Sequence, residues 1–158
     1  MYFSISNSYT IRNLKPRGNK PILVLCLSES EYNNLSYLEE LNNSYSNILK
    51  LNIEDKDNFD LSNAELLNDF ILENDFDEVV TCCALGMSRS PAIMICISKI
   101  LNCPKIEELV KENYKFYNKY IVNTFEQFPY TTKSIEGTEC TLNLPEKSET
   151  NKQLIRIY

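Results

Sequence analysis

Histidine is absent from the 158-residue sequence, and its absence removes several kinds of active site at once. A Ser–His or Cys–His catalytic pair, a histidine-ligated metal and a histidine pH switch are all excluded. Any proton that moves during catalysis must therefore move through a carboxylate, a thiol, a hydroxyl group or water. Glycine is scarce as well, with only three in the chain, so a glycine inside a tight loop is informative.

Long apolar runs are also missing. The longest, at residues 22–27 and 91–101, are much shorter than the roughly 20 residues that a bilayer requires, and the N-terminus lacks the pattern of a signal peptide. We therefore expect a cytoplasmic protein without a membrane partner. The six cysteines follow neither the spacing of a secreted disulfide framework nor that of paired zinc knuckles, so we expect reduced thiols and no metal.

Positive charge is in the minority, with 16 Lys and Arg against 22 Asp and Glu and a net charge of −6. This balance disfavours a nucleic acid as the main partner, because binding to its backbone needs clustered basic residues. The length and the 43% hydrophobic content indicate one globular domain. We place this domain at residues 1–128. We treat residues 129–158, which are richer in Thr, Glu and Lys, as a C-terminal extension that packs on the domain or is partly flexible.

The pattern of apolar residues predicts strands that alternate with helices. Strands are predicted at residues 21–27, 47–53 and 77–82, with a short edge strand at 153–158. Helices are predicted after them, over residues 28–41, 62–74, 91–101, 106–116 and 121–128. This alternation predicts an α/β fold with a single, largely parallel central sheet flanked by helices.

Two capping boxes support the first two helices. Ser28 pairs with Glu31, and Ser62 pairs with Glu65. Leu66, Leu67, Phe70 and Ile71 are expected on the inner face of the second of these helices. The helix expected to begin at Pro91 is apolar nearly all round, so we expect it to be buried at the centre of the domain.

The chemistry concentrates in the segment TCCALGMSRSP, which runs from Thr81 to Pro91. A loop that leads from a strand into the N-terminus of a helix directs several backbone N–H groups, and the positive end of the helix dipole, toward an anion. Arg89 can hold two phosphate oxygens with its planar guanidinium, and Gly86 permits a backbone conformation or a close approach that a side chain would obstruct. Such a field favours the thiolate of Cys83, which makes this residue a nucleophile.

Cys83, the five residues after it and Arg89-Ser90 resemble the signature loop of the protein tyrosine and dual-specificity phosphatases. The spelling CALGMSRS, the strand before it and the buried helix after it all agree with that family. The resemblance extends upstream, because Asp55 lies 28 residues before Cys83, at a strand end, where the family carries its general acid. It covers roughly residues 47–128, and Asn118 loosely matches an asparagine of the family's later helical region.

The resemblance implies a phosphomonoester hydrolase that works through a phosphocysteine intermediate, with a phosphorylated protein or peptide as substrate and without metal or cofactor. It implies four catalytic residues: Cys83 as nucleophile, Arg89 as phosphate clamp, Asp55 as acid and base, and Ser90 as hydrogen-bond donor to the departing thiolate. It also implies a phosphate cradle made by Ala84, Leu85, Gly86, Met87, Ser88 and Arg89.

The sequence departs from the family at Cys82, where a histidine usually precedes the nucleophile. That histidine hydrogen-bonds the loop, so its replacement supports a second hypothesis, a catalytically impaired module that binds a phosphate or phosphoprotein without turnover. A third hypothesis is a phosphatase of small molecules or RNA 5′ ends, which the acidic charge disfavours. The missing histidine weakens the case for an enzyme. Our hypothesis is nevertheless that activity survives, because Cys83, Arg89, Ser90 and Asp55 are all present.

Each of these residues also has a simpler interpretation. Cys83 could be a buried structural thiol, and Arg89-Ser90 an ordinary helix start. Asp57 and Asp60 share the loop of Asp55 and are alternatives for the acid, and the whole loop could be a solvated acidic turn. Cys82 is expected in the core, with a protective disulfide to its neighbour as the less favoured alternative.

Overall fold

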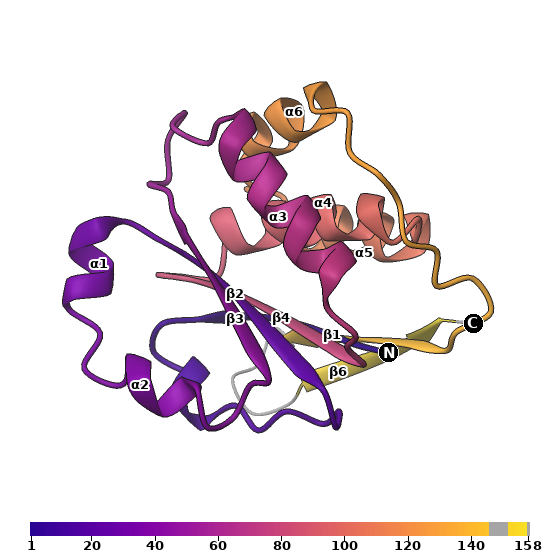
Figure 1. The fold of residues 1–158 in the computed structure, drawn as a ribbon. Coiled ribbons are helices and arrows are strands. Elements are labelled where there is room, and N and C mark those ends of the chain that lie inside the picture. The colour runs from indigo at the N-terminus through magenta and orange to yellow at the C-terminus, as the bar shows by residue number, and fades with distance from the viewer. Residues whose placement is uncertain (146–151, 158) are drawn as a thin grey trace.

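A six-stranded sheet forms the centre of the computed structural model, which describes residues 1–145 and 152–157 (Figure 1). The strand order is β3-β2-β4-β1-β5-β6, in which the first five strands are parallel and β6 is antiparallel to β5. The strands are β1 (Tyr2–Asn7), β2 (Pro21–Leu27), β3 (Asn47–Asn52), β4 (Glu78–Cys83), β5 (Cys140–Pro145) and β6 (Lys152–Ile157). The predicted α/β fold with a largely parallel central sheet is confirmed.

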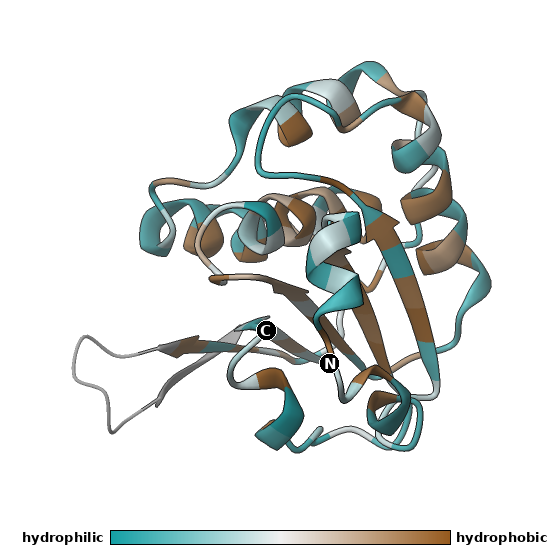
Figure 2. Ribbon diagram, turned by 90° about the vertical axis from the view of Figure 1, so that its left-hand side faces the viewer, coloured by the Kyte–Doolittle hydropathy of each residue, from teal (hydrophilic) through white to brown (hydrophobic). Residues whose placement is uncertain are grey.

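Helices cover both faces of this sheet (Figure 1). One face carries α3 (Leu61–Glu73), α4 (Arg89–Ile100), α5 (Pro104–Asn113) and α6 (Lys119–Gln127). The other carries the short helices α1 (Glu29–Asn33) and α2 (Leu38–Leu41) and a 3₁₀ turn at Ile11–Asn13. Figure 2 shows hydrophobic residues gathered in the central strands and on the inner sides of the helices.

The two faces explain why β2 reads as one continuous apolar run. Side chains alternate along a strand, so Val24 and Cys26 pack into the core beneath α3 and α4, whereas Leu23 and Leu25 pack into the smaller core on the opposite face. Every residue of β2 is buried. A strand covered on both faces needs apolar residues at every position, and the strand predicted at residues 21–27 is confirmed.

Helix α4 lies at the centre of the domain, as its all-round apolar sequence predicts. Every residue of the helix except Lys99 is buried. The helix begins at Arg89, two residues earlier than predicted, and Pro91 still lies in its first turn, where the missing N–H has no helical partner. The early start is important, because it places Arg89 and Ser90 on the first turn of the helix.

Other predicted elements are wrong in their details. The helix expected over residues 28–41 is broken into α1 and α2, although the Ser28–Glu31 capping box is present. Helix α3 is capped by Asp60, which accepts a bond from the Asn63 backbone, and not by Ser62 with Glu65. An aspartate is as good an N-cap as serine, and Asp60 precedes Ser62 in the chain, so the helix begins directly after Asp60.

One residue predicted on the inner face of α3 does not lie there. Leu66 is 51% exposed, whereas Leu67 and Ile71 are buried on that face.

The chain beyond residue 128 supplies β5 and β6 of the central sheet. Strand β6 matches the predicted edge strand, except for Tyr158, which lies outside the described residues. No helix in the described ranges has the length and apolar character needed to cross a bilayer.

Candidate active site

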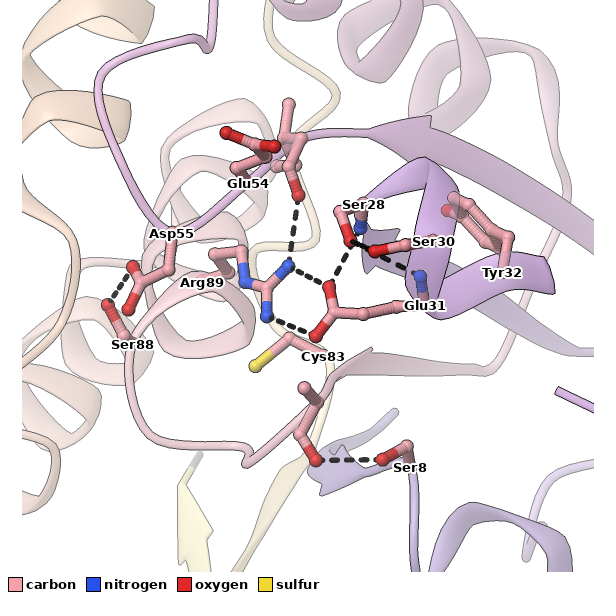
Figure 3. Close-up of polar contacts among 12 residues, drawn as sticks. Ser8, Ser28, Ser30, Glu31, Tyr32, Glu54, Asp55, Cys83, Ser88 and Arg89 are labelled. Atoms are coloured by element: carbon pink, nitrogen blue, oxygen red, sulfur yellow. Dashed lines mark hydrogen bonds and ion pairs between the residues drawn. The ribbon is translucent and has the colours of Figure 1, made fainter. Parts of the chain in front are cut away.

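Cys83 is the last residue of β4, and its side chain faces the core beneath α4. The backbone N–H of Gly86 donates to its sulfur at 3.2 Å, and the hydroxyl oxygen of Ser90 lies 3.1 Å from the same atom. The loop of residues 84–88 thus curls around the sulfur (Figure 3), and the first turn of α4 supplies the Ser90 hydroxyl beside it. The thiol lies within polar contacts of the loop, unlike a thiol that is packed only against hydrocarbon.

Gly86 gives the 84–88 loop its curvature. Its φ angle is 72°, in the left-handed region, and a Cβ atom there would lie 2.9 Å from the carbonyl oxygen of Ser6. Both predicted reasons for a glycine, an unusual backbone conformation and a close approach, therefore hold at this position. The end of β1 also fixes the start of the loop, because the Ser8 backbone N–H and hydroxyl both donate to the Ala84 carbonyl.

The loop presents its backbone inward and its side chains outward. Leu85 and Met87 are 63% and 55% exposed. Ser88 occupies the N-cap position of α4, but its side chain does not cap the helix. The first-turn amides of α4 are thus left for an anion, at the positive end of the helix dipole. Of the six residues predicted to cradle phosphate, residues 84–88 can offer their backbone amides and Arg89 can add its guanidinium, while the Ser88 hydroxyl is bound to Asp55.

Arg89 reaches across the site from α4 and is held by two elements. Its side chain is 7% exposed. Two of its nitrogens donate to the Glu31 carboxylate, at 2.6 and 3.1 Å, and Nη1 also donates to the Ile53 carbonyl at 3.0 Å (Figure 3). The hydrogen bond from Arg89 lowers the pKa of Glu31 to about 2, and the Ser28 backbone N–H adds to this effect while burial opposes it. Both groups of the pair are charged at neutral pH.

The hydrogen-bond donors of Arg89 can be counted. A guanidinium has five N–H groups, and three of those of Arg89 are used: two on Nη1 and one on Nη2. The Nε–H and the second Nη2–H find no acceptor within residues 1–145 and 152–157. These two donors lie on the same edge of the planar group, where they can bind two oxygens of one anion. Glu31 and Ile53 thus fix the guanidinium and leave its bidentate edge open.

Asp55 lies in the loop after β3 and is bound to the 84–88 loop. Its Oδ1 accepts a bond from the Ser88 hydroxyl at 2.6 Å and one from the Asn118 amide at 3.2 Å. Its other oxygen, Oδ2, has no hydrogen-bond partner within the described ranges. Figure 3 shows Asp55 on the far side of the site from Glu31, with Cys83 and Arg89 between them. The sequence position at a strand end thus brings this carboxylate to the loop.

Asn118 joins three parts of the site. Its side-chain amide also donates to the Lys56 carbonyl, and its Oδ1 accepts from the Ile121 backbone as the N-cap of α6. Its backbone N–H donates to the Ser88 carbonyl at 3.0 Å. The asparagine that resembles the family only loosely in sequence therefore positions Asp55 against the loop.

The two alternative acids have other places. Asp60 caps α3 and accepts bonds from the Asn63 backbone and the Ser62 hydroxyl. Asp57 is exposed and has no hydrogen bond to the 84–88 loop in the described structure. Of the three aspartates, Asp55 is the one that the fold brings against the loop.

Cys82 faces the opposite side of the sheet from Cys83. It is 1% exposed and packs in the smaller core, and burial raises the pKa of its thiol. Its sulfur contacts the Cys83 carbonyl oxygen at 3.7 Å. The prediction of a core residue is confirmed. The two neighbouring thiols point away from each other here, so the structure does not pair them.

Two contributions to the site were missed from the sequence. Glu31 was assigned to a capping box, which it forms, and the same carboxylate also holds Arg89. The signal in the sequence was that Glu31 lies in the first turn of a helix that follows the end of a strand. Strand β1, whose Ser6 contacts the loop together with Ser8 just after the strand, was missed as well, although Phe3 to Ser6 alternate apolar and polar residues as a strand does.

No group of three or more His, Cys, Asp or Glu side chains that could hold a metal ion occurs within residues 1–145 and 152–157. The polar groups of the site are the Cys83 thiol, the Arg89 guanidinium, the Glu31 and Asp55 carboxylates and the amides of the 84–88 loop.

Comparisons with known proteins locate the fold. No model of a known protein family and no curated protein matches the sequence. Among solved structures, the crystal structure of PTPMT1 in complex with PI(5)P is similar, with a TM-score of 0.54 and 16% sequence identity. The similarity covers 70% of this chain and 76% of that one. The chain shares the α/β fold of that protein, with a parallel sheet flanked by helices.

Proposed function

We propose that this protein is a cysteine-dependent phosphomonoester hydrolase of the protein tyrosine and dual-specificity type. One observation carries the proposal: the open bidentate edge of Arg89 and the amides of the 84–88 loop belong to the same site as the sulfur of Cys83. A tetrahedral dianion bound there would have its phosphorus next to the sulfur. The fold shared with PTPMT1, a phosphatase of this type, supports the same reading.

In the first proposed step, the Cys83 thiolate attacks phosphorus and the bond to the leaving oxygen breaks. Asp55, protonated, gives its proton to that oxygen, so that an alcohol leaves and a phosphocysteine remains. Arg89 and the loop amides hold the three other oxygens and stabilise the charge that develops on them. Oδ2 of Asp55 is suited to carry the transferred proton, because Ser88 and Asn118 both bind Oδ1 and leave Oδ2 open.

In the second step, Asp55 takes a proton from water, which attacks phosphorus and releases inorganic phosphate. The sulfur departs as a thiolate, and Ser90 stabilises it. The Ser90 hydroxyl lies 3.1 Å from the sulfur and 3.3 Å from the Ser6 carbonyl, so its single proton can turn from the carbonyl to the thiolate.

The proposed substrate is a phosphorylated protein or peptide in the cytoplasm. A phosphoinositide is a second candidate, because the similar structure of PTPMT1 contains PI(5)P. Rates measured on a phosphotyrosine peptide, a phosphothreonine peptide and a short-chain phosphoinositide would separate the two classes.

The direct test is hydrolysis of p-nitrophenyl phosphate by the wild type and by Cys83→Ser, with Cys103→Ser as a control thiol outside the site. We expect activity in the wild type and the control and none in Cys83→Ser. Equal rates in all three proteins would refute the proposal. Phosphate binding without turnover in the wild type would instead support the impaired binding module, for which Cys82 in the histidine position is the specific argument.

A further inference from the structure

A cleft lies beside the 84–88 loop, where two parallel strands diverge. Strand β4 pairs with β1 along its whole length, to Asn7, but the pairing of β5 with β1 extends only from Tyr2 to Ser4. Next to the last residues of β1 the sheet therefore opens, and the cleft there has a volume of about 280 Å³. Leu85, Gly86 and Met87 form one of its walls.

The lining of this cleft is polar but uncharged. Six hydroxyl and amide side chains line it, together with apolar ones, and no charged residue of the described chain does. The six are Ser4, Ser6, Asn7, Thr10, Tyr114 and Asn143. A second phosphate group would find no cation there, so the lining favours a neutral ligand that forms hydrogen bonds.

Two of the residues that line the cleft each carry a buried oxygen without a hydrogen-bond partner in the described part of the chain. Tyr114 Oη and Asn143 Oδ1 have no hydrogen-bond partner within the described residues. Buried polar atoms without a partner are rare in folded proteins, because each forfeits the hydrogen bonds that it makes with water when exposed. Burial also raises the pKa of Tyr114 to about 12, so its hydroxyl keeps the proton at neutral pH and can donate it.

The volume of the cleft is larger than a single bridging water molecule needs and is enough for a small ligand. One water takes up about 30 Å³ in the liquid, so a cleft of about 280 Å³ is far larger than one bridging molecule requires. It lies close to the lower end of the range typical of small-molecule pockets, roughly 300 Å³. A six-membered ring that bears hydroxyl groups has the size and the hydrogen-bonding capacity to occupy it.

We propose that this cleft binds a neutral, hydroxyl-rich group of about the size of a polyol ring, with Tyr114 donating to it and Asn143 accepting from it. Gly86 connects the cleft to the active site, since its backbone N–H faces Cys83 and its α-carbon faces Ser6. Binding in the cleft follows from the cleft alone. Only its influence on phosphate binding rests on the proposed phosphatase function.

Saturation-transfer NMR with myo-inositol as the probe tests the proposal. We expect saturable binding to the wild type with a dissociation constant in the millimolar range, and no comparable binding of cyclohexanol, which has the ring but a single hydroxyl. Tyr114→Phe and Asn143→Leu should each weaken inositol binding about five- to tenfold, the effect of one hydrogen bond. Tyr120→Phe, which alters an exposed tyrosine on α6, should leave binding unchanged.

A thermal melt without ligand distinguishes this role from a structural one. Tyr114→Phe should leave the Tm unchanged or raise it, because the hydroxyl forms no bond that could be lost. A clear fall in Tm would show that the hydroxyl already has a partner and would overturn the proposal, as would the absence of saturable inositol binding in the wild type. Cys83→Ser should bind inositol normally, so a failure of the proposed phosphatase activity would leave this result intact.

Discussion

Glu31→Gln is the substitution that best isolates one interaction of the site. The glutamate makes two sets of hydrogen bonds, one to the Ser28 backbone and one to Arg89. Glutamine keeps an oxygen for the capping box, which accepts either residue at this position. It loses the negative charge, and so leaves the buried guanidinium of Arg89 without its counter-charge.

The expected loss of stability follows from the pKa of Glu31. The pKa falls from an ordinary value of 4.5 to about 2, which corresponds to about 3 kcal/mol. Because the Glu31 side chain is 31% exposed, water screens part of this interaction, and we expect about 2 kcal/mol. Arg89 should also lose its fixed orientation, so phosphate should bind about tenfold more weakly.

Urea unfolding at a series of pH values measures this effect. The folded-state pKa is lowered, so the stabilisation is complete above about pH 4.5 and is lost as the pH falls through 2. The gap in unfolding free energy between the wild type and Glu31→Gln should therefore be constant near neutral pH and shrink only in strong acid.

Glu29→Gln is the matched control, since Glu29 lies in the same helix turn but is exposed and is not a partner of Arg89. It should stay within about 0.5 kcal/mol of the wild type. If Glu31→Gln unfolds at the same urea concentration as this control at neutral pH, the account of the Arg89 ion pair is wrong.

Three other predictions test the surroundings of the site. Gly86→Ala should lower the unfolding free energy by about 1–3 kcal/mol in urea titrations, because alanine is strained at a positive φ and its Cβ would meet the backbone of β1; an unchanged midpoint would contradict the close approach. Asp60→Ala should cost about 1 kcal/mol in the same assay through loss of the α3 cap, whereas Asp57→Ala should be neutral; equal effects would be evidence against this assignment. Mass spectrometry after brief iodoacetamide treatment at pH 7 should find Cys103 modified, because a hydrogen bond from the Cys140 thiol lowers the pKa of Cys103 to about 6. Cys82 should stay unmodified until urea is added, because burial raises the pKa of its thiol. Labelling of Cys82 in the folded protein would show that the core around it opens.

The parts of the fold that could be predicted are those in which local pattern and tertiary environment agree. The apolar run at β2 indicates a buried strand, and the segment CALGMSRS indicates an anion-binding loop, and in each case a few consecutive residues are enough. Strands β1 and β5 could not be predicted, although β1 lies inside the sheet. In β1, YFSISN, apolar and polar residues alternate only from Phe3 to Ser6, which is at the short end of what indicates a strand.

The candidate site shows the same division. Cys83, Arg89 and Ser90 lie close together in sequence, so one motif identified all three. Asp55 was found from its distance to that motif. Glu31 comes from a segment 58 residues away from Arg89, and nothing local indicates such a pairing. Only the strand order, which sets the ends of β2 and β4 side by side, brings it to the guanidinium.

The most direct test of the proposed chemistry is to look for the covalent intermediate. The wild type, mixed with p-nitrophenyl phosphate and quenched in acid within milliseconds, should yield a peptide that carries one added phosphoryl group. Fragmentation should place this group on Cys83 and not on the adjacent Cys82. Product formation with an unmodified Cys83, or a phosphoryl group on another residue, would contradict the account.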